Sequence, residues 1–256
     1  MSSAKVVQIS RYPIKGLSGE NLDAAEVSAG EGLPLDRRYG LAHASSQVDP
    51  ENPEWFSKKH FLNLARDEKL GELSALYSEE AKKVALLRKG RQVVAGDLNT
   101  PEGKMVLESM LQSFMPSGAR GHARIVDAGS GCFTDQEQPF LSLINLATLK
   151  DIERVARIPL DPRRFRGNIY FEGASPWCEH DWVGKKLRIG GLVVKIVMRT
   201  DRCNAVNIDP DTGQVSGNIP LALRRGFRHC DCGVFASVLE GGTLRLDDQI
   251  EVLGDE

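Results

Sequence analysis

The sequence predicts a β-rich protein of the α+β class. Short strand-like runs recur along most of the chain, whereas only two segments show the apolar spacing of an amphipathic helix. Near the middle, Pro116 and the Ser-Gly-Ala-Arg-Gly that follows it indicate a loop or a link between domains. With 256 residues, the chain can form one large domain or two smaller ones. We therefore expect a barrel or a sandwich with additions.

Strands are expected in the first part of the chain wherever apolar residues alternate with polar ones, at 5–9, 22–27 and 38–44. The runs at 82–88 and 91–95 are separated by Lys89-Gly90, and this arrangement predicts a β-hairpin. The segment 54–64 is compatible with one helical turn followed by extended chain.

A helix is expected over 100–114, because Thr100 suits the N-cap and Pro101 the first helical position. Its apolar stripe consists of Val106, Leu107, Met110, Leu111 and Phe114. A second helix is expected over about 145–157. After Pro159 the pattern returns to strands, at 168–171, 186–189, 192–198 and 243–253, the last of these as a closing strand pair.

The composition is that of a globular protein without a dominant charge. Hydrophobic residues make up 41%, charged residues 27%, and the formal net charge is −2. We therefore expect no nucleic acid partner, and any anionic ligand must be held by a local cluster of basic residues. No apolar run approaches the ~20 residues that span a bilayer, and the amino-terminus lacks the pattern of a signal peptide. A cytoplasmic protein without membrane contact is the expectation.

Five cysteines, an odd number, argue for reduced thiols and against a disulfide framework. The sequence has no GxGxxG turn, no GxxxxGK[ST] loop, no HExxH and no GxSxG. It also lacks the paired CxxC motifs of zinc ribbons. These absences exclude the best-known nucleotide, zinc-protease and serine-hydrolase signatures.

Basic residues next to turns indicate an anion site. Lys15 follows a proline turn and precedes Gly16, and Arg37 leads into a strand. The segment 163–168 (RRFRGN) places three guanidinium groups and an amide within six residues. Arginine forks match phosphate, although each arginine taken singly is more simply a solvated surface charge.

Cys203 has polar and charged neighbours, so we do not expect it to fill a core. Arg199 and Arg202 beside it are expected to favour the thiolate, the form that binds soft metals. The Asp-Pro-Asp-Thr-Gly at 209–213 is first a turn, with calcium binding as a weaker alternative.

A rival metal cluster would use His229, Cys230 and Cys232, with Cys178 or His180 as a further ligand. Its cysteines are spaced too closely for a usual zinc site, and a structural role is preferred for them.

Several motifs, in the order in which they occur along the chain, resemble those of a known family. DRCNAVNIDPDTG, with the closing GTLRLDDQIEVL, resembles the MOSC domain (molybdenum cofactor sulfurase C-terminal domain). FTDQEQPFLSLINLATLKDI and RRFRGNIYFEG resemble its first half, and YPIKGLSGE with DRRYGLAHA resembles the β-rich domain that precedes it in the amidoxime-reducing components. The resemblance implies a β-rich α+β fold, with a MOSC β-barrel over 119–256, a smaller amino-terminal β domain over 1–118, and a few helices.

The resemblance also implies a molybdenum cofactor, that is, molybdenum on a pyranopterin. Cys203 would be the metal ligand, and Asp201 a candidate for proton delivery during catalysis. Residues that would bind the cofactor, by motif position or as neighbours of Cys203, are Lys15, Arg37, Thr134, Asp135, Arg166, Asn168 and Arg202. The chain departs from the family pattern at Gly16, where relatives have serine, and at Asp201, where relatives often have serine or threonine.

By the same resemblance, the expected activity is reduction of N-hydroxylated compounds, such as amidoximes and hydroxylamines. Electrons would come from a separate protein of the ferredoxin, flavin or cytochrome b5 type. The alternative is a cofactor-binding or sulfur-carrying protein in which Cys203 holds a persulfide.

Overall fold

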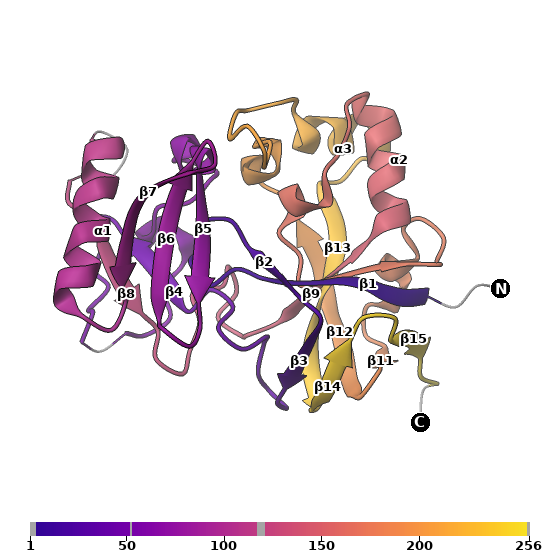
Figure 1. Cartoon of the computed structure of the whole chain (residues 1–256). Coiled ribbons are helices and arrows are strands. Elements are labelled where there is room, and N and C mark those ends of the chain that lie inside the picture. Colours follow the sequence, from indigo (N-terminus) through magenta and orange to yellow (C-terminus); the bar gives the residue numbers. More distant parts are fainter. Residues whose placement is uncertain (1–3, 52, 117–120, 255–256) are drawn as a thin grey trace.

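The computed structural model describes residues 4–51, 53–116 and 121–254, and it has two halves side by side (Figure 1). One half is a β-barrel. Seven strands form it in the spatial order β10 (Ile169–Glu172), β9 (Leu141–Asn145), β13 (Asp231–Glu240), β12 (Leu192–Asp201), β11 (Lys186–Ile189), β15 (Gln249–Val252) and β1 (Ala4–Arg11). β2 (Glu20–Leu22) adds to the outer side of β1.

The amino-terminal strand β1 closes this barrel. It pairs antiparallel with β10, where Ile9 lies opposite Ile169, and with β15, where Ala4 lies opposite Ile250. The interior is filled by fully buried aliphatic and aromatic side chains, among them Val6, Ile9, Leu143, Ile169, Phe171, Val194 and Val234. The chain leaves β1 at Arg11. The position of β1 in the closed barrel therefore sets the point from which the following segment starts.

The other half has its own core. β5 (Leu73–Ser78), β6 (Lys83–Arg88) and β7 (Arg91–Asp97) form an antiparallel sheet, and β4 (Tyr39–Ala42) pairs with β8 (Arg124–Asp127). Helix α1 (Pro101–Phe114) packs on β7 through its buried residues Leu107 and Leu111. Thr100 caps this helix by accepting a hydrogen bond from the Gly103 N–H at 3.1 Å, as the sequence predicts.

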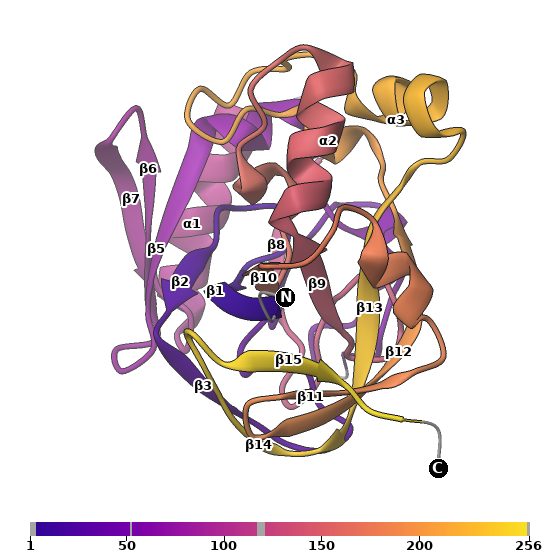
Figure 2. The same ribbon diagram turned by 90° about the vertical axis from the view of Figure 1, so that its right-hand side faces the viewer.

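Helices α2 (Leu146–Ala156) and α3 (Ile219–Phe227) pack together at one end of the barrel (Figure 2). They share a core cluster with Phe165 and Tyr170. A short ladder joins β3 (Ala24–Val27) to β14 (Gly242–Arg245). The remaining turns are the 3-10 helices η1 (Lys58–His60), η2 (Glu68–Glu72), η3 (Pro162–Phe165), η4 (Cys178–Trp182) and η5 (Asn204–Asn207).

The predicted fold class, a β-rich α+β protein with a barrel and a few helices, is confirmed. Two details are wrong. The segment 22–27 contains the end of one strand and all of another, which pair with different partners. The closing strands 243–253 form no pair with each other, because β14 joins β3 while β15 joins β1 and β11. Alternation of apolar and polar residues identifies a strand, but it does not show with which other strand that strand pairs.

Several elements were not expected from the sequence, namely α3, β5, β8, β9 and β13. α3 carries Gly226 near its end, and an interior glycine weakens a helical pattern. The predicted domain boundary between 118 and 119 lies outside the described residues and stays a prediction.

A bulge in β13 controls how the ladder between β12 and β13 ends. Arg199 lies opposite Val234 but Asp201 lies opposite Asp231, so β13 holds one additional residue here. Gly233 supplies it with φ +76°, and a Cβ at this position would lie 2.4 Å from the Leu143 carbonyl oxygen. Only glycine fits this position without displacing β9.

We expect Gly233→Ala to lower the free energy of unfolding by about 2–4 kcal/mol, since it adds a backbone clash to an unfavourable φ. Gly129→Ala is the matched control, because Gly129 has φ +64° but nothing within 4 Å of the added Cβ. It should cost only about 1 kcal/mol. Urea unfolding of both variants measures the difference, and equal losses would show that the contact with β9 is not limiting.

Candidate functional site

A cavity of about 350 Å³ lies between the barrel and the amino-terminal half. We call it the central cavity. Its wall contains every site residue predicted from the sequence: Lys15, Arg37, Thr134, Asp135, Arg166, Asn168, Asp201, Arg202 and Cys203. These residues come from segments that are far apart in the chain, so the folding of the two halves brings them together.

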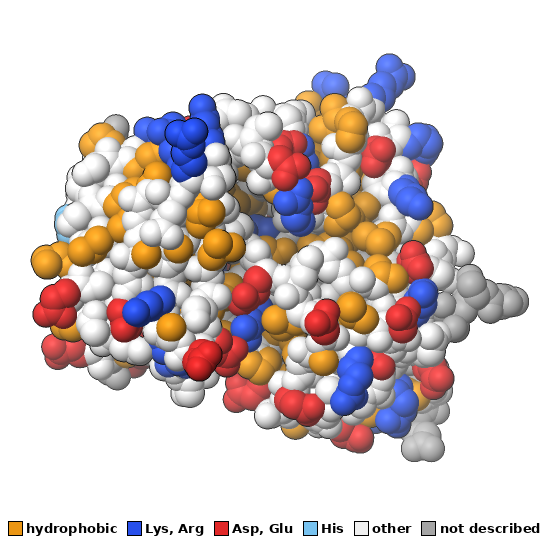
Figure 3. All heavy atoms as spheres, viewed as in Figure 1, with side chains coloured by type: hydrophobic (Ala, Val, Ile, Leu, Met, Phe, Trp, Pro, Cys, Tyr) orange, Lys and Arg blue, Asp and Glu red, His pale blue; other side chains and the backbone are white. Residues whose placement is uncertain are grey.

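The wall of the central cavity is strongly cationic although the whole chain carries a net charge of −2. Its cations are Lys15, Arg37, Lys58, Arg164, Arg166, Arg199 and Arg202, and its carboxylates are Asp36, Asp135 and Asp201. In the space-filling view, Lys and Arg atoms are visible inside the hollow between the two halves (Figure 3). Such a concentration of donors suits an anionic ligand.

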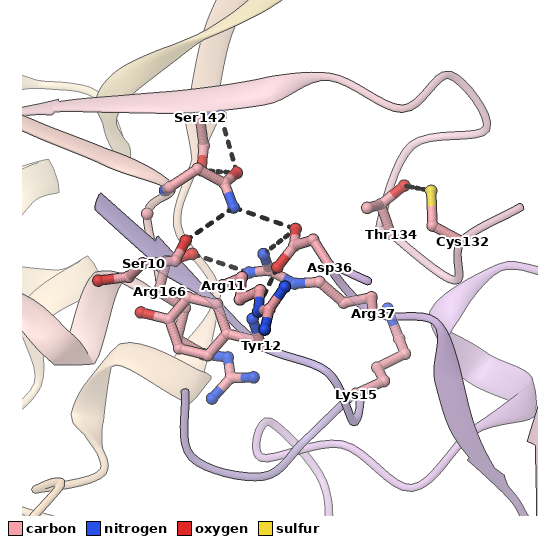
Figure 4. A network of polar contacts seen from close by, with 12 residues as sticks. Ser10, Arg11, Tyr12, Lys15, Asp36, Arg37, Cys132, Thr134, Ser142 and Arg166 are labelled. Carbon is pink, nitrogen blue, oxygen red and sulfur yellow. Dashed lines mark hydrogen bonds and ion pairs between the residues drawn. The ribbon is translucent and has the colours of Figure 1, made fainter. Parts of the chain in front are cut away.

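A buried carboxylate, that of Asp36, organises one side of the cavity (Figure 4). It accepts hydrogen bonds from the Tyr12 N–H at 2.8 Å and from the Asn168 amide at 3.0 Å. It also accepts one from the Arg37 guanidinium. Three segments therefore meet on one side chain. In the sequence, the indication for the Asp36 carboxylate was its position directly before Arg37.

Arg37 and Arg166 both contact the ring of Tyr12, with guanidinium carbons 4.4 and 4.3 Å from its centre. Both residues have a left-handed backbone, with φ +50° and +52°. Arg37 donates to the Arg166 carbonyl oxygen at 2.8 Å, and Arg166 donates to that of Leu17 at 2.6 Å.

Arg166 has an uncompensated charge. Among the described residues, no carboxylate lies within 4.0 Å of its guanidinium, whereas Arg37 is paired with Asp36. Burial, followed by repulsion from Arg37, lowers the pKa of Arg166 to about 10. An anion bound in the cavity would relieve both effects.

The other two arginines of the 163–168 segment are already neutralised. Arg163 pairs with Asp161 at 2.6 Å and with Asp211 at 2.7 Å, and Arg164 pairs with Asp209 at 2.8 Å. The second oxygen of Asp209 accepts hydrogen bonds from the Asp211 and Thr212 N–H groups. The 209–213 segment is therefore a turn held by its own carboxylate, as preferred from the sequence.

Lys15 and Asp135 form an ion pair at 2.6 Å, and Lys58 approaches the second oxygen of Asp135 at 3.0 Å. Burial opposes ionisation of Asp135, but the two ammonium groups outweigh it and hold its pKa well below its ordinary value. Lys58 comes from η1, in the segment whose structure the sequence left ambiguous. No motif indicated a role for it.

Cys203 lies two residues after the end of β12, and its half-buried thiol lines the cavity. Arg202 does not face it as expected. Its guanidinium donates to the carbonyl oxygens of Cys232, at 2.6 and 2.8 Å, and of Phe165, at 2.9 Å. Arg202 thus fastens the segment that carries the cysteine to the β13 bulge and to η3.

Lys58 lies close enough to Cys203 for the two groups to interact electrostatically. Burial opposes the charge on Lys58, but Asp135, Cys203 and Asp201 outweigh it and raise its pKa. Asp201 itself is exposed at the edge of the cavity. A thiol, an ammonium and a carboxylate therefore lie near one another at the open side.

Asn168 and Thr134 use their polar atoms within the protein. The Asn168 oxygen accepts from the Ser142 N–H at 3.0 Å and the Ser142 hydroxyl at 2.9 Å, while its amide donates to Asp36. The Thr134 hydroxyl donates to the Gln136 carbonyl oxygen at 2.7 Å. Both residues line the cavity and at the same time fix its wall.

The rival cysteine cluster does not assemble as a metal site. Within the described ranges, no three His, Cys, Asp or Glu side chains are placed to hold a metal ion. Cys232 is fully buried, and burial raises the pKa of its thiol to about 12. Cys230 accepts a hydrogen bond from Arg224 at 2.9 Å. His180 and His229 pack instead with Trp177 in an aromatic group.

The helices of the described ranges are too short or too polar to cross a membrane.

Comparison with known proteins identifies relatives that match part of this chain. Mitochondrial amidoxime-reducing component 1 from Homo sapiens is 30% identical over 128 residues, which cover 45% of this chain and 37% of that protein. Molybdenum cofactor sulfurase from Oryza sativa subsp. japonica is 38% identical over 96 residues, which cover 37% of this chain and 11% of the sulfurase. The matches thus span well under half of each relative.

Among solved structures, the YuaD protein from Bacillus subtilis aligns over 99% of this chain and 97% of its own, with a TM-score of 0.47 and 12% identity. The family model of the MOSC domain matches residues 132–251. That range contains Cys203, Arg166 and the barrel strands β9 to β13. Residues 132–251 of this chain are therefore a MOSC domain.

Proposed function

We propose that this protein is a molybdenum-cofactor-dependent oxidoreductase that reduces N-hydroxylated compounds. The observation that carries the proposal is the central cavity, whose wall holds both the half-buried thiol of Cys203 and the guanidinium of Arg166, which has no carboxylate within 4.0 Å among the described residues. The names of the relatives, an amidoxime-reducing component and a molybdenum cofactor sulfurase, support a molybdenum-related role.

The donor set fits such a cofactor. A thiolate is a ligand that soft metals accept, and Cys203 is the only cysteine on the described wall of the central cavity. The anionic part of the cofactor needs guanidinium and ammonium donors, and Arg166 and Lys15 supply them. Thr200 also lines the cavity, and its buried hydroxyl has no hydrogen-bond partner among the described residues.

In this proposal each residue has a distinct task. Cys203 holds the metal, Arg166 and Arg37 bind the anionic part of the cofactor, and Lys15 does so next to Asp135. Arg202 is a positioning residue, because its hydrogen bonds hold the segment that carries Cys203 in place. Asp201, exposed at the cavity edge, delivers a proton to the leaving oxygen.

The reaction breaks the N–O bond of the substrate. Two electrons and two protons enter, an amine or amidine leaves with its nitrogen reduced, and the oxygen departs as water. The bound cofactor would supply the two-electron chemistry. A separate electron-transfer protein, of the ferredoxin, flavin or cytochrome b5 type, would restore the electrons.

A second candidate function is transfer of sulfur through a Cys203 persulfide. The likeness to a molybdenum cofactor sulfurase favours it, and the Cys203 thiol that lines the central cavity would carry the sulfur. Intact-mass measurement separates the two, because a persulfide adds about 32 Da to the chain without molybdenum.

Cys203→Ser should abolish stoichiometric molybdenum in protein isolated from a molybdate-fed host, and with it hydroxylamine reduction, since the hydroxyl is a poor ligand for a soft metal. Cys132→Ser is the matched control, because Cys132 is also half-buried but does not line the central cavity. Metal analysis and turnover report the result. Full molybdenum content and activity in Cys203→Ser would refute the proposal.

Arg166→Gln should reduce cofactor retention by about 10- to 100-fold, the value of a charge-assisted hydrogen bond. The free energy of unfolding of the cofactor-free protein should change by less than about 1 kcal/mol, because removing the charge also removes the repulsion with Arg37.

Arg163→Gln is the control for this variant, since it makes the same substitution in the same segment but at a guanidinium already paired with Asp161 and Asp211. It should retain the cofactor normally. Pterin and molybdenum per chain are measured in both variants, and equal retention would show that Arg166 does not bind the cofactor.

A further inference from the structure

A second cavity of about 350 Å³ adjoins the central one. The two share Asp36, Thr134 and Phe140 in their walls, so one side of each is common. The second cavity lies between the segments 26–36, 53–55 and 128–140. No motif pointed to it, and the proposed reaction assigns it no role. We call it the acidic cavity.

Its charge is opposite to that of the central cavity. Glu26, Glu31, Glu54 and Glu137 line it together with Asp36, and none of the described residues in its wall is Lys, Arg or His. Glu26 is engaged with the Thr243 hydroxyl. Glu31, Glu54 and Glu137 have no cationic nitrogen of the described chain within 4.0 Å. Asp and Glu side chains also gather on the lower surface in the space-filling view, where β3 and β14 lie (Figure 3).

Three aromatic side chains also line this cavity. Phe133 is fully buried, and Phe140 and Trp55 are half-buried. The Trp55 indole N–H donates to the Thr134 carbonyl oxygen at 3.1 Å, which holds the ring against the wall shared with the central cavity. Aromatic faces next to carboxylates attract organic cations, through cation–π contact and charge pairing together.

We propose that the acidic cavity binds organic cations of the amidinium and protonated-amine class. The volume suits a small molecule, the carboxylates recognise its charge, and the aromatic wall covers its apolar part. Assignment of this ligand as substrate or product of the enzyme rests on the proposed function, because amidines and amines are what that reaction releases. Binding itself requires neither the cofactor nor turnover.

The test uses benzamidine, a planar amidinium cation, and benzamide, its neutral analogue of the same shape. Isothermal titration calorimetry of the full chain at about 50 mM salt, where surface charges are weakly screened, measures both. Benzamidine should bind at least about tenfold more tightly than benzamide, and the difference should shrink as salt rises. Equal affinity for the two compounds would overturn the proposal.

Variants locate the site. Glu54→Gln with Glu137→Gln should weaken benzamidine binding by about five- to tenfold and leave benzamide unaffected. Glu240→Gln with Glu251→Gln, at exposed glutamates on β13 and β15, is the control that changes the net charge by the same amount elsewhere and should bind normally. Trp55→Leu should weaken benzamidine by about three- to tenfold, with Trp55→Phe restoring part of the loss. Benzamidine binding that survives all of these changes would place the cation elsewhere and refute the site.

Failure of this inference is distinguishable from failure of the proposed function. Cys203→Ser should lose molybdenum yet bind benzamidine with unchanged affinity. A protein that binds benzamidine selectively but holds no molybdenum would keep the acidic cavity as a cation site and reject the reductase. A molybdenum-loaded reductase with equal affinity for benzamidine and benzamide would do the opposite.

Discussion

The carboxylate of Asp36 is the interaction on which the site depends. It is 5% exposed and satisfies donors from Tyr12, Arg37 and Asn168, which belong to three separate segments. A buried charge of this kind is tolerated only when it is fully hydrogen-bonded, so each donor helps to keep the other two in place. The loop that carries Asp36 and the residue directly before β10 of the barrel are thereby held together at one point. Arg37 is oriented by the same carboxylate.

Barrel closure supplies the second constraint. β1 belongs to the barrel, and Tyr12 and Lys15 follow immediately after it. The strand that completes the barrel therefore also delivers the first residues of the cavity wall. On the opposite side, the Gly233 bulge allows Arg202 to reach the Cys232 carbonyl oxygen, and this fixes the start of the segment that carries Cys203. Both ends of the site are thus set by the barrel.

The central cavity and the acidic cavity share part of their walls but carry opposite charges, so they suit ligands of opposite charge. The central cavity is cationic and the acidic cavity has only carboxylates as charged groups in its described wall. Asp36 lines both cavities, but its carboxylate is already paired with Arg37 and hydrogen-bonded to Asn168. The remaining charges, Arg166 on one side and Glu54 and Glu137 on the other, decide which ligands each cavity attracts. Local fields of this kind are invisible in a net charge of −2.

The sequence by itself determined the β-rich class, the capped helix α1, the hairpin of β6 and β7, and the residue types that gather in the central cavity. Those features depend on neighbouring residues, whose periodicity, turn chemistry and motifs can be read along the chain. Only the tertiary structure decided that Arg166, and not Arg163 or Arg164, keeps a free charge, because the carboxylates that neutralise the others include Asp209 and Asp211 from a distant turn. It also decided that Lys58 approaches Cys203, that β14 and β15 take different partners, and that four glutamates surround a second cavity. Each of these is a pairing between segments far apart in the sequence, and local pattern carries no information about which distant groups will meet.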